Sequence, residues 1–300
     1  RVIHAHDLDT LGVGVKLKKE WKAKLVYDSH EWYTGSIHVE NRPMVRFIWK
    51  YLEKKWIKAV DSVITVNQSI AELFLNQYAF LPSVEIIRNF DQAPAFIADE
   101  TPDINWRNTG IAHKIISFSS QKACVLAYGG YLQKGRGLEA SIEALSELPD
   151  NLGLLIAGEG PLSDSIKERI DELGISNRVL MCGQLHPEDL YRLYQHADIG
   201  LSLIEPLATS YRLSLPNKIS QYIQSGLAVI GSDLPEIRRI ILEHNCGTIV
   251  HKYSRLSASI LEIYSDLNSY QSAAEKCAAV LSWKQESEHL LNIYSRLMTA

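Results

Sequence analysis

The second half of the chain alternates short apolar runs with segments of helical periodicity, and this alternation restricts the fold more than any other feature. The strand-like runs lie at 125–128, 154–157, 179–182, 199–203 and 228–230. Parallel strands need a crossover of a dozen or more residues between them, and an intervening helix supplies that crossover. The pattern therefore predicts an α/β fold with a parallel sheet covered by helices on both faces.

A similar alternation precedes this region, with strand-like runs at 2–5, 24–27, 62–66 and 84–87. Residues 90–122 are rich in Pro, Asp, Asn and Ser and have weak periodicity, which indicates a connection between two halves. A chain of 300 residues also exceeds the usual size of one domain. We expect a first domain at 1–110, a second at 111–282 and a terminal helix at 283–300.

Composition excludes several classes of protein. The net charge of −4 and a pI near 6.2 give no reason to expect nucleic acid as a partner. The four cysteines, at 124, 182, 246 and 277, have no paired spacing, which argues against a disulfide framework or a zinc ribbon. No apolar run approaches the roughly 20 residues of a membrane span. A cytoplasmic location is expected.

A glycine-rich turn with two cations follows the run at 125–128. It begins with Gly129-Gly130 and continues through Lys134 and Arg136 to a helix that starts near Leu138. Backbone N–H groups, a helix N-terminus and an arginine together attract phosphate. A tight turn with solvated cations explains the segment equally well. The later glycine pair at 158–160 is weak evidence for a dinucleotide site. An NAD-dependent oxidoreductase is disfavoured because neither half has a complete glycine fingerprint after its first strand.

The helix predicted at 216–224 has one polar and one apolar face. The polar face consists of Asn217, Lys218 and Gln221. The apolar face consists of Ile219, Tyr222 and Ile223. Ser214 is expected to cap this helix. A polar, singly charged face at the start of a helix beyond a strand is suited to a diphosphate and a ribose diol, although a capped surface helix has the same pattern.

Two histidine–acid clusters, His4-Ala-His6-Asp7 and Asp28-Ser-His30-Glu31, end the runs at 2–5 and 24–27. Because carboxyl ends of neighbouring parallel strands meet at one sheet edge, the two clusters are candidates for a catalytic site. A single histidine is more often packed or solvated than catalytic. Asp7-Leu-Asp9 also matches a metal-binding D-x-D pattern, but so short a match arises often by chance.

A basic stripe runs along the helix predicted at 42–58. Its cations recur at steps of four, at Arg42, Arg46, Lys50, Lys54 and Lys58. With the aromatic residues Phe47, Trp49 and Trp56, the stripe suits peripheral contact with an anionic membrane surface. A solvated face over a buried apolar face is the alternative, and it is slightly favoured.

Taken in order, these segments resemble glycosyltransferase family 4, the retaining sugar transferases of the GT-B fold. The matching segments are 2–7, 27–31, 59–66, 130–138, 156–161, 179–183 and 215–233. The resemblance implies two Rossmann-like domains, with the terminal helix from Trp283 packed back on the first. The family's first strand and its glycine-rich loop do not precede Val2, so the first domain is expected to be truncated at its N-terminus.

The resemblance also implies roles for individual residues. Arg136 and Lys218 would hold the donor diphosphate, with Gly130 in the phosphate turn and Asn217 and Ser214 beside it. The main chain of Gly183–Leu185 would take the base, and Gln221 stands where the family usually has a ribose-binding Glu. His6 would face the donor sugar, with Asp7 and His30 on the acceptor side. The cations replace a metal, so no metal or other cofactor is expected.

The implied function is transfer of a sugar from a nucleoside-diphosphate sugar to a polysaccharide, glycolipid or lipid-linked acceptor, at the inner face of the membrane. The alternative is a non-catalytic nucleotide-sugar-binding homologue or fragment that acts as a partner subunit. Gln221, in place of a carboxylate, favours this alternative because an amide binds a hydroxyl less strongly than a charged acceptor does.

Overall fold

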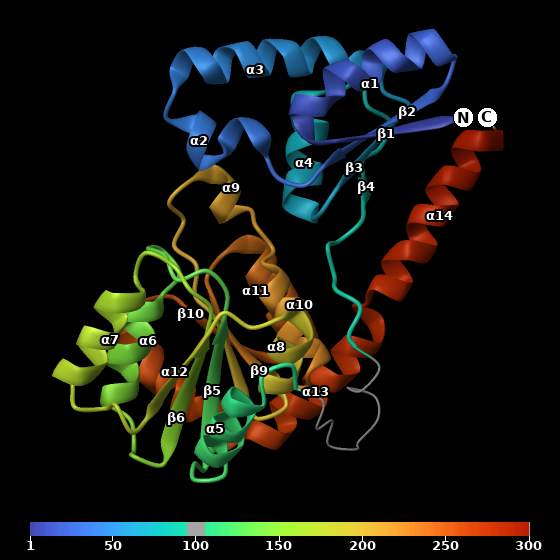
Figure 1. The fold of residues 1–300 in the computed structure, drawn as a ribbon. Helices are drawn as coiled ribbons and strands as arrows, with labels where there is room; N and C mark the ends of the chain where they lie inside the picture. The colour runs from blue at the N-terminus through green and yellow to red at the C-terminus, as the bar shows by residue number, and fades with distance from the viewer. Residues whose placement is uncertain (95–105, 300) are drawn as a thin grey trace. The chain divides into compact units, whose positions relative to one another are not determined.

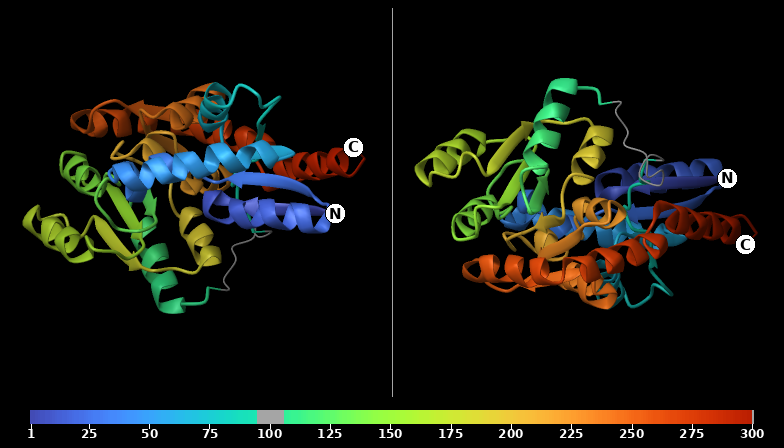
Figure 2. Two further views of the ribbon diagram at one scale, coloured as in Figure 1. Left: turned by 90° about the horizontal axis from the view of Figure 1, so that it is seen from above. Right: turned by 90° about the horizontal axis from the view of Figure 1, so that it is seen from below.

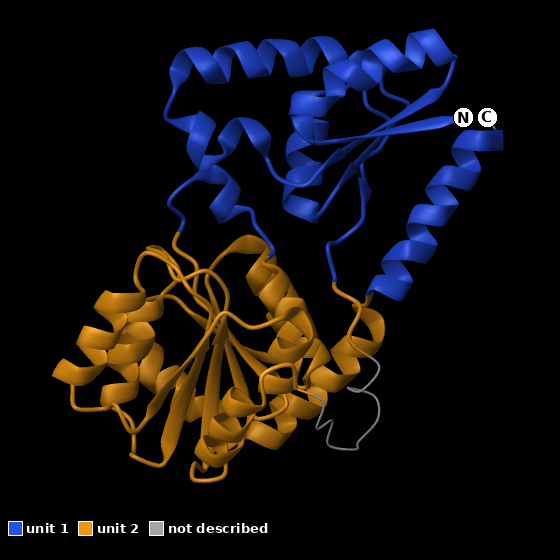
Figure 3. Cartoon of the chain, viewed as in Figure 1, with its two compact units in different colours: residues 1–90, 206–215, 283–300 blue, residues 91–205, 216–282 orange. Residues whose placement is uncertain are grey.

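The computed structural model describes residues 1–94 and 106–299, which form two compact units, each with its own parallel sheet (Figure 3). Unit 1 comprises residues 1–90, 206–215 and 283–300, and unit 2 comprises residues 91–205 and 216–282. Part of the predicted connection, residues 95–105, lies outside the described residues. Across the described ranges, no helix is both long enough and apolar enough to span a bilayer.

Unit 1 has a four-stranded parallel sheet in the order β1-β2-β3-β4 (Figure 1). Its strands are β1 (Val2–His6), β2 (Lys24–Ser29), β3 (Ser62–Thr65) and β4 (Glu85–Ile86). Its helices are α1 (Asp7–Trp21), α2 (Ile37–Glu40), α3 (Pro43–Trp56), α4 (Gln68–Gln77), α9 (Thr209–Arg212) and α14 (Trp283–Thr299). The register of β1 on β2 pairs His4 with Val26 and His6 with Asp28. The two predicted histidine–acid clusters therefore share one sheet edge.

Alternating side chains of β2 supply the two hydrophobic cores of unit 1. Leu25 and Tyr27 pack with residues of α1 and α4 on one face of the sheet. Val26 packs with Ile293 of α14 on the other face. The terminal helix therefore covers the sheet face opposite α1 and α4.

Unit 2 has a six-stranded parallel sheet in the order β10-β9-β8-β5-β6-β7. Its strands are β5 (Cys124–Gly129), β6 (Leu152–Ala157), β7 (Val179–Gly183), β8 (Ile199–Ser202), β9 (Ala228–Ser232) and β10 (Gly247–Val250). The chain proceeds outward from β5 to β7 and then returns to place β8 on the other side of β5. This reversal is a topological switch point, where ligands bind beyond the carboxyl ends of the strands.

Helices cover both faces of the unit 2 sheet, as the alternation predicts (Figure 2). One face packs against α6 (Leu138–Ser146), α7 (Ser163–Glu172) and α12 (Leu256–Ser265). The remaining helices are α5 (Thr109–Ser119), α8 (Pro187–Tyr194), α10 (Asn217–Gln224), α11 (Pro235–His244) and α13 (Leu267–Val280). The predicted strands are confirmed to within two residues at their ends, but the helix α5 lies inside the segment expected to be a connection. Asn108 caps α5 by accepting a hydrogen bond from the Ile111 N–H.

Candidate functional site

The turns after β5, β6 and β7 are joined by backbone hydrogen bonds at the carboxyl edge of the unit 2 sheet. Gly130 N–H donates to the Ala157 carbonyl at 2.9 Å, and Gly158 N–H donates to the Gly183 carbonyl at 2.8 Å. These bonds hold the three turns in one layer. The glycines that the sequence singled out at 130 and 183 thus belong to the same small region of the fold.

Gly158 is required here by space and by backbone conformation. Its φ is +137°, and a Cβ on it would lie 1.9 Å from the Gly130 carbonyl oxygen. Gly130 itself has a φ of +140°. Side chains rarely adopt such conformations, so these positions favour glycine and leave the backbone of both turns open to a ligand.

A pocket of about 590 Å³ lies against these turns. Its lining residues are Gly130, Tyr131, Ala157, Gly158, Glu159, Gly160, Gln184, Leu185 and Leu190. Two of the predicted donor-binding residues, Gly130 and Leu185, contribute to the lining, and Gly183 lies one residue before Gln184. The pocket combines main-chain polar groups with a few apolar side chains, which is typical of sites for small molecules.

Lys218, in the first turn of α10, points its ammonium at the same region. Its Nζ lies 3.7 Å from the centre of the Tyr128 ring. A Cβ on Gly130 would lie 3.4 Å from that Nζ. Burial, and then the positive charge of Arg136, lower the pKa of Lys218 to about 7. An anion beside these two cations would relieve their repulsion, so the pair is suited to a phosphate group.

The other residues of α10 are buried and exposed as the predicted two-faced pattern requires. Ile219, Tyr222 and Ile223 are buried. Asn217 is exposed, and Gln221 is partly exposed with its side-chain N–H donating to the Asp91 carboxylate at 2.6 Å. The expectation that Ser214 caps α10 is wrong, because Pro216 holds the N-cap position and the Ser214 hydroxyl donates to the Tyr211 carbonyl. Ser214 also belongs to unit 1 rather than to unit 2.

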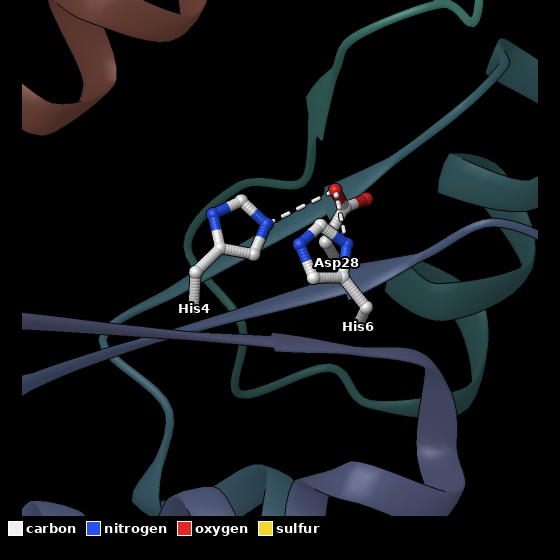
Figure 4. Close-up of side chains that lie close together, drawn as sticks. All are labelled: His4, His6 and Asp28. Carbon is white, nitrogen blue, oxygen red and sulfur yellow. Dashed lines mark hydrogen bonds and ion pairs between the residues drawn. The ribbon is translucent and has the colours of Figure 1, made fainter.

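Unit 1 holds the second candidate group, at the carboxyl ends of β1 and β2 (Figure 4). His4 Nε2 lies 3.0 Å and His6 Nδ1 lies 3.5 Å from Asp28 Oδ2. His30 Nε2 lies 2.9 Å from His6 Nδ1 and 3.6 Å from the same carboxylate oxygen. Burial, and then the charge of His4, lower the pKa of His6.

Asp7 positions one of these histidines from the start of α1. Its φ of 59° is a left-handed conformation that is uncommon for a residue with a side chain. In this conformation its carboxylate accepts the His30 backbone N–H at 3.0 Å. Burial is the main cause of a raised pKa at Asp7, with the charges of Asp9 and Asp28 adding to it. The structure therefore brings His6, Asp7 and His30 together, as the sequence predicts.

The sequence places His4 and Asp28 in the two candidate clusters, but the family resemblance implies individual roles only for His6, Asp7 and His30. His4 and Asp28 were recoverable from strand geometry, because residues two apart on a strand point to the same face. His4 shares a face with His6, and Asp28 shares one with His30. What the sequence did not supply is the register that pairs His6 with Asp28.

With this geometry in place, comparison with known proteins identifies the family. Residues 112–279 match the family model for group 1 glycosyl transferases, and residues 1–90 match the model for glycosyltransferase family 4. The chain belongs to the group 1 glycosyl transferases. The resemblance inferred from its motifs is confirmed.

Two curated relatives of this chain have names that refer to a diacylglycerol glycolipid or to a dolichol-linked sugar. The chain is 23% identical over 269 residues to alpha-monoglucosyldiacylglycerol synthase of Streptococcus pneumoniae, a match that covers 87% of this chain and 58% of the relative. It is 24% identical to chitobiosyldiphosphodolichol beta-mannosyltransferase of Candida albicans, over 82% of this chain and 55% of the relative. The chain thus spans a little over half the length of these two relatives.

Solved structures show the fold. Anabaena HepE in complex with UDP and glucose matches with a TM-score of 0.74 at 15% identity, over 98% of this chain and 78% of that one. Sucrose-phosphate synthase from Thermosynechococcus elongatus matches with a TM-score of 0.73 at 17% identity, over 99% and 74%. The glycosyltransferase has the GT-B fold, with two Rossmann-like units, as its motifs predict.

Proposed function

We propose that this chain transfers a sugar from a nucleoside-diphosphate sugar to a hydroxyl group of a glycolipid, a lipid-linked precursor or a polysaccharide. The observation behind the proposal is the Lys218 ammonium, held beside the glycine turn of Gly130 at the edge of a pocket. Two similar proteins support it by name: HepE, solved with UDP and glucose, and the S. pneumoniae diacylglycerol glycolipid synthase.

The donor would bind in unit 2. Lys218 and Arg136 would neutralise the diphosphate, and Asn217 at the start of α10 would donate to it from the exposed face. The backbone at Gly183–Leu185 would hydrogen-bond the base, because Leu185 and its neighbour Gln184 line the pocket. Gln221 and the Asp91 carboxylate to which it donates are available for the ribose hydroxyls.

The chemical step would break the bond between the anomeric carbon and the diphosphate oxygen. The acceptor oxygen forms its new bond to that carbon from the same face, and its proton passes to the departing diphosphate. Retention of configuration follows from attack on the same face. Lys218 and Arg136 stabilise the negative charge that grows on the leaving group, which is commonly the largest contribution to such catalysis. The step needs no metal ion because the two cations supply this stabilisation.

In unit 1, His6 would face the donor sugar, and Asp7 and His30 would serve the acceptor side. An imidazole whose pKa is lowered is neutral near pH 7 and can accept a hydrogen bond from a hydroxyl group. Asp7 would keep the His30 backbone in place through its hydrogen bond to the N–H.

A direct test measures donor binding and turnover with a panel of nucleoside-diphosphate sugars. We expect calorimetric binding of one of them and release of its nucleoside diphosphate when acceptor lipids are present, with the anomeric configuration read by NMR. Lys218→Met should weaken donor binding at least tenfold, whereas the control Lys114→Met, at an exposed lysine of α5, should not change it. Binding without turnover would favour a non-catalytic partner subunit, and no binding by any donor would refute the proposal.

Peripheral contact with a membrane, through α3, is the second part of the proposal. Met44 is 80% exposed, Phe47 72%, Ile48 51% and Tyr51 61%. These spacings of three and four put all four side chains on one stripe of the helix. The alternative given by the sequence was a helix whose apolar face is buried and whose cations are solvated. It does not describe the N-terminal half of α3, where the apolar side chains are exposed.

Cations accompany this apolar stripe. They are Arg42, Arg46, Lys50, Lys54, Lys55 and Lys58. An apolar stripe among cations suits a surface of anionic lipid, which in cells is the cytoplasmic leaflet. The inner face of the membrane is therefore the proposed site of action.

Vesicle co-sedimentation tests the membrane contact. The chain should bind vesicles that contain phosphatidylserine more strongly than pure phosphatidylcholine, and added salt should weaken the binding. Phe47→Asp should reduce partitioning at least about tenfold, since burying one aromatic side chain contributes about 1.5–3 kcal/mol. Leu261→Asp, on an exposed leucine of α12, is the matched control. Equal binding by the two variants would contradict the assignment to α3.

A further inference from the structure

The histidine–aspartate group of unit 1 has a property that sugar transfer does not require. Ligand atoms of His4, His6 and Asp28 all lie within 4.8 Å of one another. Among the residues that the structure describes, no group of three or more His, Cys, Asp and Glu side chains converges in this way elsewhere, outside this cluster and its neighbour His30. We propose that these three residues form a binding site for a divalent transition-metal ion, and that Zn²⁺ is the ion they fit best.

The donor atoms determine this choice of ion. Two imidazole nitrogens and one carboxylate oxygen are ligands that Zn²⁺ takes, often with a fourth position left to water. Magnesium and calcium prefer sites made wholly of oxygen. The group therefore favours a borderline metal ion over the alkaline-earth ions.

The two distances from the Asp28 carboxylate oxygen are close to those of tetrahedral coordination. Zinc bonds of about 2.0–2.1 Å separate neighbouring ligand atoms by roughly 3.3 Å. Asp28 Oδ2 lies 3.0 Å from His4 Nε2 and 3.5 Å from His6 Nδ1. His30 Nε2 lies beside this group, 2.9 Å from His6 Nδ1 and 3.6 Å from Asp28 Oδ2. The fourth position is left to water. The His4 and His6 rings are stacked at 15°, so one of them must rotate to point its nitrogen at a shared ion.

The surroundings supply an outer partner and a route of entry. His4 Nδ1 is hydrogen-bonded to the Tyr294 hydroxyl of α14, which leaves Nε2 directed at Asp28. Partners of this kind fix the orientation of a metal-bound histidine. The side chains of His4 and Asp28 are 16% and 13% exposed, whereas that of His6 is 59% exposed. An ion can therefore enter from the solvent side of His6.

Occupation of this site would regulate the transfer reaction. The inference at this step rests on the proposed function, in which His6 faces the substrates. A zinc ion would engage the His6 nitrogen that a hydroxyl group needs, so zinc is expected to inhibit transfer reversibly. The ion takes no part in transfer itself.

The binding test does not depend on activity. Metal-free protein is titrated with Co²⁺. Visible absorption bands of the bound cobalt indicate low-symmetry coordination by nitrogen and oxygen. Added Zn²⁺ should then displace the cobalt one for one. His4→Gln and Asp28→Asn should remove the bands, and Tyr294→Phe should weaken zinc binding about tenfold through loss of the outer partner. His113→Ala, at an exposed histidine of α5, is the control. Thermal melts confirm that each variant is folded.

The outcomes separate cleanly. Zinc binding that persists unchanged in folded His4→Gln and Asp28→Asn variants would overturn the assignment, as would the absence of a cobalt spectrum in the unmodified protein. A cobalt spectrum in a chain that transfers no sugar would leave the metal site standing and refute only the proposed function. If transfer occurs, zinc should inhibit it, and Asp28→Asn should require at least tenfold more zinc for the same inhibition. Transfer unaffected by saturating zinc would refute the regulatory role.

Discussion

Binding of a nucleoside diphosphate is expected to take up a proton at Lys218. In the ligand-free protein, burial and the charge of Arg136 lower the pKa of Lys218 to about 7, so above that pH its amine is mostly neutral. A diphosphate beside the amine favours the charged form and returns the pKa towards its ordinary value. The diphosphate therefore binds mainly to the molecules in which Lys218 is protonated. Because this fraction decreases as the pH rises, the affinity for the nucleotide must fall.

The size of the effect follows from that pKa. If only the protonated form binds, the affinity falls by a factor of about two at pH 7, about eleven at pH 8 and about one hundred at pH 9. Proton uptake at pH 8 should be about 0.9 per nucleotide bound. The affinity stops falling once the pH exceeds the pKa that Lys218 has in the complex.

Isothermal titration calorimetry measures both quantities. Titrations run from pH 7.5 to 9.5, above the second phosphate pKa of about 6, in pairs of buffers that differ in ionisation enthalpy. Lys218→Arg keeps a permanent charge, so its affinity should be almost independent of pH and its heat independent of the buffer. A flat affinity in the unmodified protein, with equal heats in both buffers, would refute the placement of Lys218 against the phosphates.

Three stability measurements by urea unfolding follow from the same structure. Because Lys218 titrates near 7 when folded and near 10.5 when unfolded, the ligand-free protein should gain stability as the pH rises between these values, and Lys218→Met should remove that gain. Gly158→Ala should lower the free energy of unfolding by about 3 kcal/mol or more, because its φ is +137° and the new Cβ would meet a backbone carbonyl. Gly174→Ala, which has open space around it, should lower it by only about 1 kcal/mol. Similar losses in the two variants would contradict the steric argument. Asn67→Ala should lower the free energy of unfolding by about 2–4 kcal/mol, because the buried Asn67 side chain both caps α4 and donates to the Leu213 carbonyl. Asn108→Ala removes only the cap of α5 and should lower it by about 1 kcal/mol.

Strands β5 to β9 of unit 2 could be predicted because the residue pattern of each one reflects its burial, whereas β10 and the helices α11 to α13 were not predicted. A buried parallel strand is apolar along its whole length, and a helix that lies on a sheet repeats its apolar residues at three and four. Ile219, Tyr222 and Ile223 illustrate the second pattern, and the structure buries all three. The helix α5 could not be predicted because its short apolar pattern directly follows a polar stretch, and the two together have the composition of a connection.

Discontinuous organisation could not be predicted in this way. Residues 206–215 interrupt the second half of the sequence and yet belong to unit 1, where Leu213 joins the hydrophobic core. No local pattern indicates which sheet a short segment will join. The expected cap at Ser214 was wrong for a local reason, because the Ser214 hydroxyl donates to the Tyr211 carbonyl and Pro216 holds the N-cap position.

The sequence by itself determined the α/β class, the family and the residue types that gather at two strand edges, because periodicity and short motifs are properties of neighbouring residues. Tertiary structure alone decided what those residues can do. The lowered pKa of Lys218 depends on its burial and on Arg136, which lies more than eighty residues away in the chain. The closeness of His4, His6 and Asp28 depends on the register of two parallel strands. Strand order and register are set by packing over a whole unit, and local sequence does not contain them.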